Sequence, residues 1–350
     1  AIDTITKYGD VKLQYDFTSA AKISGSHSYG AHSIHDSDLL LGTVKSGGAK
    51  LFKITSAHSI STLSAMTGIS AVNALDRFGS YTLIGSTRTS GTLKTLSWYN
   101  GTTVSGIRNT NPIVRAIKTV GIRAYTSEYI AALSGDQLFY STSLPTFTSA
   151  YNAGKNRKIP KIGELNGVPY FLVQEGNKVE FFKWDETAEQ AYKIYTFSNL
   201  TNFGILQYLT LLIITGTSNN KKVAYAFNGA WIKPIFDDQL RDTSFDFSKP
   251  FEFEGNLQVK GATWDGEYWF PGIYAKFATV QYTPFVNYNN RAYGYAVTGS
   301  NMRIGYQDTS KRAISGNIVS SEFGSNIGGV DKLFNSVKIN CEALATGQTI

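Results

Sequence analysis

The sequence predicts an all-β protein, a single β-propeller of six or seven four-stranded blades. One observation is a two-strand unit that occurs five times, with turns at residues 47, 91, 135, 176 and 219, in steps of 44, 44, 41 and 43 residues. Repeats in the low forties that consist of hairpins are typical of propeller blades. A second observation is the composition, with 17% charged residues, 33 Gly, 21 Tyr and 21 Phe among 350 residues. Such a composition favours strands joined by tight turns.

The five hairpins are short apolar runs on either side of a turn that contains Gly or Asn. Because a blade of about 43 residues has room for four strands, two more strands are expected in each repeat. Candidates for these are residues 113–117, 158–165, 191–197 and 231–236. The paired runs of the hairpins are 39–44 with 51–54, 83–85 with 93–98, 129–133 with 138–140, 170–173 with 179–182, and 211–214 with 223–227.

The strand that closes the ring is expected near the N-terminus. Residues 10–17 alternate, with Val11, Leu13, Tyr15 and Phe17 on one face. An open sheet edge invites aggregation, so we expect this strand to complete a blade that begins near the C-terminus. The propeller is therefore predicted to span residues 1–340, and residues 341–350 to form an exit segment toward a further element.

After Asp237 the period lengthens. A sixth hairpin is predicted at 264–270, where Asp265-Gly266 supplies a turn, and 291–297 is its expected partner. The aromatic segment 273–290 between them is interpreted as an insertion. A last unit is expected at 311–323 and 332–339. Residues 24–38 are predicted to be a polar loop that enters the first blade.

The charge is basic but dispersed. The net charge is +7 and the densest basic group is Lys155-Asn156-Arg157-Lys158, with Lys161 close by. This group is either a solvated turn or a contact for a polyanion. Cys341 is the only cysteine, which excludes an intramolecular disulfide. No apolar run approaches the roughly 18 residues that span a bilayer, so we expect no membrane span, and we do not expect nucleic acid as a partner.

Few residues suggest catalysis. His27, His32 and His35 with Asp36 and Asp38 are either a group satisfied by local contacts or a zinc or manganese site. Carboxylates before and within the sixth hairpin are expected to form turns, although paired carboxylates are what a glycosidase needs. We predict no catalytic, metal-binding or cofactor-binding residues and no cofactor. The carboxylates concerned are Asp237, Asp238, Asp242, Asp246, Asp265 and Glu267.

The aromatic segment is the best candidate for a contact surface. Tyrosine beside asparagine is typical of surfaces that bind proteins or sugars, because flat amphipathic rings provide contact area at low entropic cost. The alternative is that the rings fill the gap between two blades. The predicted contact residues are Tyr274, Phe277, Tyr282, Phe285, Tyr288 and Asn289.

The chain resembles the β-propeller domains of structural proteins in tailed-bacteriophage particles. The resemblance lies in the hairpin 170–184, the segment Trp264-Asp265-Gly266-Glu267-Tyr268-Trp269-Phe270-Pro271-Gly272, and the terminal strand 332–339. It implies a non-enzymatic virion component of the tail, neck or baseplate, assembled in the host cytoplasm. The implied partners are other virion proteins in a symmetric assembly, or a host-surface glycan. The alternative function is a carbohydrate-binding propeller or a glycan hydrolase.

Overall fold

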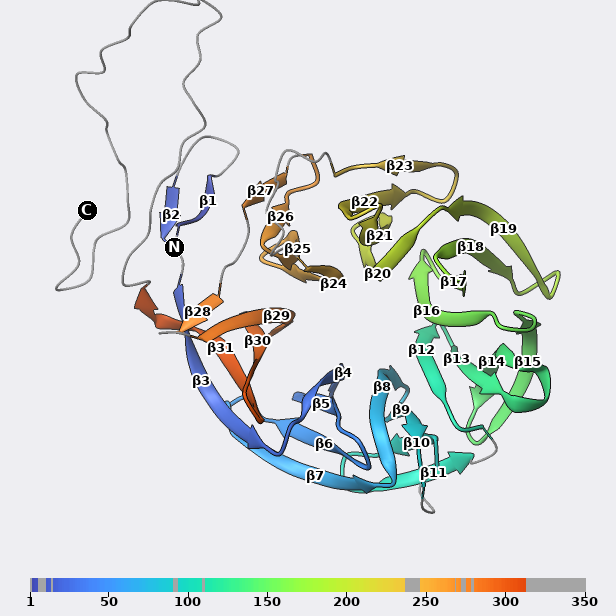
Figure 1. The fold of residues 1–350 in the computed structure, drawn as a ribbon, viewed down its shortest axis with the longest axis horizontal. Coiled ribbons are helices and arrows are strands. Elements are labelled where there is room, and N and C mark those ends of the chain that lie inside the picture. Colours follow the sequence, from blue (N-terminus) through green and yellow to red (C-terminus); the bar gives the residue numbers. More distant parts are fainter. Residues whose placement is uncertain are drawn as a thin grey trace, which may run out of the picture.

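The computed structural model describes residues 2–5, 11–13, 15–90, 94–108, 111–236, 246–267, 269–271, 275–277 and 280–312. These residues form a β-propeller whose blades surround a central channel (Figure 1). Four sheets are separate four-stranded blades, and the eight-stranded sheet contains two blades joined only by the pairing of Val44 with Ala71. The five-stranded sheet is the seventh blade. The predicted fold class is confirmed, and the ring has seven blades.

Each blade is an antiparallel meander whose first strand lines the channel (Figure 1). Blade 1 consists of β4 (Ser28–His35), β5 (Asp38–Val44), β6 (Gly48–Ile54) and β7 (Ile60–Thr67). Blade 2 consists of β8 (Ile69–Phe78), β9 (Tyr81–Arg88), β10 (Leu96–Tyr99) and β11 (Val104–Arg108). Blade 3 consists of β12 (Val114–Val120), β13 (Arg123–Ile130), β14 (Gly135–Ser143) and β15 (Thr146–Asn152), with the 3-10 turn η1 (Ala131–Leu133) between β13 and β14.

The other four blades follow the same order. Blade 4 consists of β16 (Lys158–Leu165), β17 (Val168–Glu175), β18 (Lys178–Asp185) and β19 (Gln190–Phe197). Blade 5 consists of β20 (Leu200–Tyr208), β21 (Leu211–Ser218), β22 (Lys221–Phe227) and β23 (Ile232–Pro234). Blade 6 consists of β24 (Asp246–Phe253), β25 (Asn256–Lys260), β26 (Ala262–Trp264) and β27 (Trp269–Pro271). Blade 7 consists of β29 (Val280–Tyr288), β30 (Arg291–Thr298), β31 (Asn301–Arg312) and β3 (Tyr15–Ser24).

Four of the five predicted hairpins are the second and third strands of blades 1, 2, 4 and 5. In blade 3 the run 138–140 lies in β14, but the run predicted at 129–133 overlaps only the end of β13, and residues 131–133 form η1 instead. In each of these blades the second strand contains five consecutive buried residues. Both faces of the strand are covered because neighbouring blades pack against it. A strand buried on both faces has a continuous apolar sequence, which is why these strands could be recognised from the sequence.

The ring is closed by strand β3, which pairs antiparallel with β31 over most of its length (Figure 1). The N-terminal closure was therefore predicted, but its bounds were wrong. Residues 11–13 form β2 (Val11–Leu13) and pair with β1 (Ile2–Ile5) instead. The closing strand continues beyond Phe17 because its partner β31 is long enough to pair with it as far as Ser24.

Three other predictions are corrected. Residues 280–288 are the channel strand β29, so the segment predicted as an insertion contains a blade strand, preceded by the short β28 (Ala275–Phe277). The hairpin at 264–270 pairs β26 with β27, and residues 291–297 belong to the next blade. Residues 28–35, predicted to be in a loop, are the channel strand β4. The units expected beyond residue 312, and the exit segment, lie outside the described residues.

Candidate functional site

The predicted contact residues separate into buried rings and one exposed amide. Tyr282, Phe285 and Tyr288 are at most 4% exposed, whereas Asn289 is exposed. Tyr274 and the side chain of Phe277 lie outside the described residues. For the three buried rings, the packing alternative is the correct one.

Each buried ring is held by residues distant in sequence. Tyr282 stacks on Phe17 of β3, with ring centroids 5.6 Å apart. Phe285 packs against Tyr29 of β4 at 4.9 Å. The Tyr288 hydroxyl donates to the carbonyl oxygen of Ser37 at 2.5 Å. These rings therefore join blade 7 to its closing strand and to blade 1.

Asn289 borders a hollow of about 400 Å³ between blades 7 and 1. Asp36 and Ser37 line it from blade 1, and Asn287, Asn289 and Asn290 line it from blade 7. The Asn287 Oδ1 atom is buried and has no hydrogen-bond partner among the described residues. The hollow is therefore rich in amide and carboxylate groups that can bind hydroxyl-bearing ligands.

The turns between the first and second strands all lie at one end of the ring, because the blades are related by rotation and each strand reverses direction. We call this end the first-turn face. Its two-residue turns are 36–37, 79–80, 121–122, 166–167, 209–210, 254–255 and 289–290. The first residue of every turn has a positive φ, between 49° and 58°. Such turns match the twist of paired strands.

Several large apolar side chains protrude from the first-turn face. Ile122 is 80% exposed and Leu209 is 64% exposed, both in first turns. Ile34, next to the turn of blade 1, and Trp231, in the third-to-fourth turn of blade 5, are also exposed. On the opposite face, Leu133 and Val297 are exposed. The first-turn face thus carries apolar groups on blades 1, 3 and 5.

Leu209 is unusual in its backbone as well as in its exposure. The corresponding positions in the other blades are Asp, Gly, Gly, Asn, Glu and Asn. Glycine, asparagine and aspartate adopt positive φ with little strain, whereas the Cβ atom of leucine comes too close to the backbone carbonyl oxygen in that conformation. Neither burial nor backbone preference explains a leucine there.

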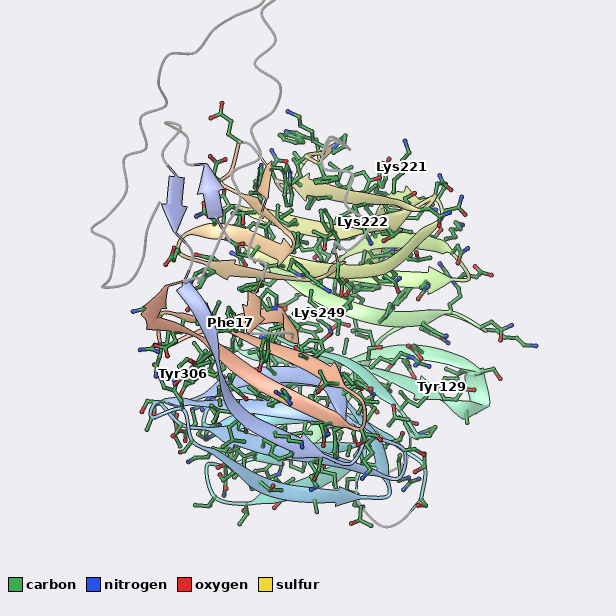
Figure 2. All side chains as sticks on the ribbon, turned by 60° about the vertical axis from the view of Figure 1, so that its left-hand side comes forward. Phe17, Tyr129, Lys221, Lys222, Lys249 and Tyr306 are labelled. Carbon is green, nitrogen blue, oxygen red and sulfur yellow. The ribbon has the colours of Figure 1, made fainter. Side chains whose placement is uncertain are left out.

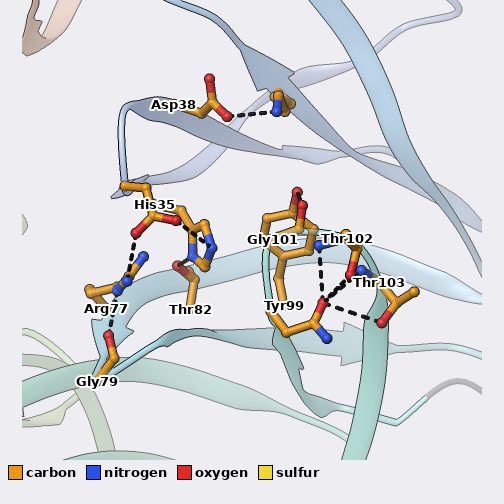
Figure 3. Close-up of polar contacts among 12 residues, drawn as sticks. His35, Asp38, Arg77, Gly79, Thr82, Tyr99, Gly101, Thr102 and Thr103 are labelled. Atoms are coloured by element: carbon orange, nitrogen blue, oxygen red, sulfur yellow. Dashed lines mark hydrogen bonds and ion pairs between the residues drawn. The ribbon is translucent and has the colours of Figure 1, made fainter.

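Polar contacts tie the turn of blade 1 to blade 2 on this face (Figure 3). An Arg77 guanidinium nitrogen lies 2.8 Å from Asp36 Oδ1, and Arg77 Nε donates to the carbonyl oxygen of Gly79 at 2.6 Å. The buried His35 ring shares a hydrogen bond of 2.9 Å with the Thr82 hydroxyl. These contacts link the first turn of blade 1 to blade 2 at one place on the face.

The histidines do not converge on one point. The Nδ1 atom of His27 lies 3.0 Å from Thr43 Oγ1, and that of His32 lies 2.6 Å from the Tyr29 hydroxyl. Burial lowers the pKa of His27 and His35, and it lowers the pKa of His32 to about 4. Each ring thus has its own hydroxyl partner at Nδ1, while the buried Nε2 atom of His27 has no hydrogen-bond partner among the described residues. Across the described residues, no group of three or more histidine, cysteine, aspartate or glutamate side chains is placed to hold a metal ion.

The predicted basic loop and acidic turns are also separate features. Arg157 is ion-paired with Glu180, and Lys161 lies in β16 and faces the channel. Asp265 Oδ1 accepts a hydrogen bond of 2.8 Å from the backbone N–H of Glu267, as expected of a turn former. Asp237, Asp238 and Asp242 lie outside the described residues.

The central channel contains a cavity of about 540 Å³ that is lined by the first strands of all seven blades. Its charged lining includes His32 from blade 1, Lys161 from blade 4 and Lys249 from blade 6. Sequence patterns do not indicate Lys249, because a lone lysine between Ser248 and Pro250 belongs to no motif. Leu209 was also missed, because it was included in an apolar run interpreted as a strand. The eight residues before it, Thr201–Tyr208, already have the length of a complete strand, and this length could have indicated a turn at Leu209.

Among the described residues, no helix has the length and apolar character needed to cross a membrane. No protein-family model matches the chain, and no curated protein sequence matches it.

Solved structures match the chain in fold. Virginiamycin B lyase from Staphylococcus aureus matches with a TM-score of 0.59 and 10% identity, over 83% of this chain and 99% of the lyase. The WD40 β-propeller domain of Doa1 matches with a TM-score of 0.51 and 10% identity, over 85% of this chain and 98% of the domain. Acylaminoacyl peptidase from Pyrococcus horikoshii matches with a TM-score of 0.54 and 10% identity, over 86% of this chain and 54% of the peptidase. At these identities the likeness shows the fold alone: the chain is a β-propeller.

Proposed function

We propose that this propeller is a non-enzymatic structural protein of a tailed-bacteriophage particle, in the tail, neck or baseplate, and that its first-turn face contacts a neighbouring virion subunit. The observation that carries the proposal is the set of exposed apolar side chains on that face. The assignment to a virion rests on the resemblance of the sequence to propellers of such particles. The assignment of the face rests on the geometry of the turns.

The apolar groups are spread around the ring, and a broad, flat partner would cover them best. Ile34, Ile122 and Leu209 lie on blades 1, 3 and 5. Stable interfaces bury roughly 800 Å² per partner, with apolar and aromatic anchors inside a polar rim. A subunit that lies across the ring could bury these three side chains together, whereas a small ligand could contact only one of them.

The strained turn of blade 5 supports a contact role for Leu209. A leucine at φ 53° costs about 1 kcal/mol relative to a residue suited to that conformation, and because Leu209 is 64% exposed, burial of its side chain offsets little of that cost. Strain in a surface turn is a reason to look for function at that position. We infer that Leu209 is an anchor for the neighbouring subunit.

The variant Leu209→Asn tests this directly. Asparagine suits the positive φ, so the free energy of unfolding should rise by about 0.5–1 kcal/mol. Incorporation into the particle should nevertheless fall, because the apolar anchor is lost. Urea unfolding measures the first effect. Native mass spectrometry of the chain with its particle components measures the second.

Val297→Thr is the matched control, because Val297 is 51% exposed on the opposite side of the ring. It should leave incorporation unchanged. Incorporation of Leu209→Asn at the level of the unmodified chain would contradict the assigned face. A chain that stays monomeric and joins no particle component would contradict the virion role itself.

A second candidate function is carbohydrate binding at the hollow between blades 7 and 1. It is favoured by the three asparagines there and by the unpartnered Asn287 Oδ1, because amides recognise sugar hydroxyls in fixed directions. If the chain joins no assembly, a glycan array would be the experiment that decides this alternative.

A further inference from the structure

The central channel concentrates positive charge that the chain itself does not neutralise. The basic side chains that line it are His32, Arg115, Lys118, Lys161 and Lys249, and the acidic side chains are Asp76 and Glu252. They come from blades 1, 2, 3, 4 and 6. The question is which of these charges already have partners.

Blades 2 and 3 satisfy their own charges. The Arg115 Nε atom lies 2.8 and 3.0 Å from the two carboxylate oxygens of Asp136. Asp76 accepts a hydrogen bond of 2.5 Å from the backbone N–H of Thr119. The charge of Lys118 lowers the pKa of Asp76, although burial is the larger effect and raises that pKa. The uncompensated charge therefore lies on the other side of the channel.

Lys161 and Lys249 carry that charge. The ammonium group of Lys161 makes no hydrogen bond or ion pair with any of the described residues, and burial lowers the pKa of this group. Lys249 projects from β24 (Figure 2), its ammonium group lies 2.5 Å from the Tyr295 hydroxyl, and it sits over the rings of Tyr29 and Tyr295 at 4.2 and 4.4 Å. Neither contact supplies a full negative charge.

The two lysines and His32 also act on one another electrostatically. Burial and the charge of Lys161 lower the pKa of Lys249 to about 8, against an opposing effect of Asp246. The charges of Lys249 and Lys161 add to burial in lowering the pKa of His32. His32 is therefore neutral near pH 7, and the two lysines from blades 4 and 6 face one cavity of about 540 Å³, where a bound anion would reduce their repulsion.

We propose that the central channel binds a small oxyanion, a carboxylate or a phosphate-type group, between Lys161 and Lys249. Ammonium groups form charge-assisted hydrogen bonds with such oxygens, and Tyr29 of blade 1 and Phe285 of blade 7, whose rings are 4.9 Å apart, form an aromatic part of the cavity wall. The site is distinct from the first-turn face, so it does not depend on the assembly role proposed above.

The test is titration calorimetry of the intact chain with sulfate and with glucuronate at constant ionic strength. The charges of these probes do not change between pH 7 and 9.5. Tighter binding of sulfate would assign a phosphate-type ligand, and tighter binding of glucuronate would assign an acidic sugar. Failure of both to bind with a Kd below about 10 mM would overturn the proposal.

Lys161→Gln and Lys249→Gln should each weaken binding at least tenfold, and Lys233→Gln, on the outer strand β23, should not change it.

If binding requires the charged form of Lys249, affinity should fall about thirtyfold from pH 7 to 9.5, because that group is protonated below its pKa of about 8 and neutral above it. Lys161→Gln should also raise the Tm of the anion-free chain, because it removes repulsion. Equal affinity at both pH values would argue against the lysine site even if one variant failed to fold.

Discussion

At the scale of single residues, glycines mark the points where one blade touches the next. A Cβ atom on Gly42 of blade 1 would lie 2.3 Å from Val72 Cγ1 of blade 2, and one on Gly85 of blade 2 would lie 2.7 Å from Val114 Cγ1 of blade 3. A Cβ atom on Gly163 of blade 4 would lie 2.7 Å from Ile205 Cδ1 of blade 5. Real Cβ atoms do not approach this closely, so these positions require glycine.

We therefore expect Gly42→Ala to destabilise the chain. The added methyl group would push β5 away from Val72, which is fully buried, at a cost of about 1–3 kcal/mol. Urea unfolding followed by far-UV circular dichroism measures the change in the free energy of unfolding.

Two further variants test whether the close contact with Val72 causes the loss of stability in Gly42→Ala. Gly48→Ala lies in the same blade with no atom within 4 Å of its Cβ, and it should be neutral or slightly stabilising. Combining Gly42→Ala with Val72→Ala should cost at least about 1 kcal/mol less than the two changes added together. Strict additivity would show that the clash with Val72 is not responsible.

At the scale of elements, the closing strand depends on one aromatic ring. Phe17 of β3 (Figure 2) is fully buried, and it packs with Phe251, Phe253 and Tyr282. It is thus the residue that joins the N-terminal strand to blades 6 and 7. Backbone pairing with β31 and the buried side chain of Ile23 also hold the strand.

Phe17→Ala should lower the free energy of unfolding by about 3–5 kcal/mol, as large cavities in cores do. Ser19→Ala, at an exposed position on the same strand, should change it by less than about 0.5 kcal/mol. Limited proteolysis provides a second measurement, since a loosened β3 should be cut before the ring. A Phe17→Ala chain as stable and as resistant as the Ser19→Ala chain would refute the closing role.

The elements also show what the sequence could and could not predict. Second strands such as β5 and β21 were found because burial on both faces gives runs like Leu39-Leu40-Leu41 and Leu212-Ile213-Ile214. Of the channel strands, β12 and β16 were predicted from residues 113–117 and 158–165. Strand β4 was missed, because one of its faces meets the polar cavity and its sequence is mixed. A strand of mixed polarity has no period that distinguishes it from a loop.

The candidate site was harder to predict than the strands. Tyr282 and Tyr288 were candidates both for a contact surface and for packing between blades, because aromatic residues alone do not tell burial from exposure. Lys161 and Lys249 are separated by most of two blades in sequence, and only ring closure brings them to one cavity. Such convergence depends on tertiary structure, which no local pattern encodes.

At the scale of the whole molecule, blade 7 must also join blade 1 across the final seam of the ring. The Tyr288 hydroxyl donates to Ser37 O at 2.5 Å and lies 3.3 Å from Ile54 O, both in blade 1. The His58 ring of blade 1 hydrogen-bonds the Tyr293 hydroxyl and stacks on Tyr306, with centroids 4.0 Å apart. The seam is thus held by tyrosines of blade 7 on backbone and side-chain groups of blade 1.

Tyr288→Phe removes the hydroxyl without changing the ring, so it tests the seam alone. The free energy of unfolding should fall by about 1–2 kcal/mol, because a buried hydrogen bond to a carbonyl is lost. Hydrogen exchange should quicken at the backbone of residues 37–41 and 288–293 before it quickens in blades 3 to 5. Mass spectrometry of exchanged peptides measures this order.

The control is Tyr81→Phe, since Tyr81 packs edge-on against Trp98 at 4.8 Å and its hydroxyl makes no hydrogen bond to any other described residue. It should leave both stability and exchange unchanged. If the Tyr288→Phe chain were equally unaffected, the seam would be held by packing alone.

Assembly should be normal in the Tyr288→Phe chain, because a residue that stabilises the ring from inside contributes nothing to a neighbour's contact. A selective loss of assembly would instead restore Tyr288 to the contact surface predicted from the sequence.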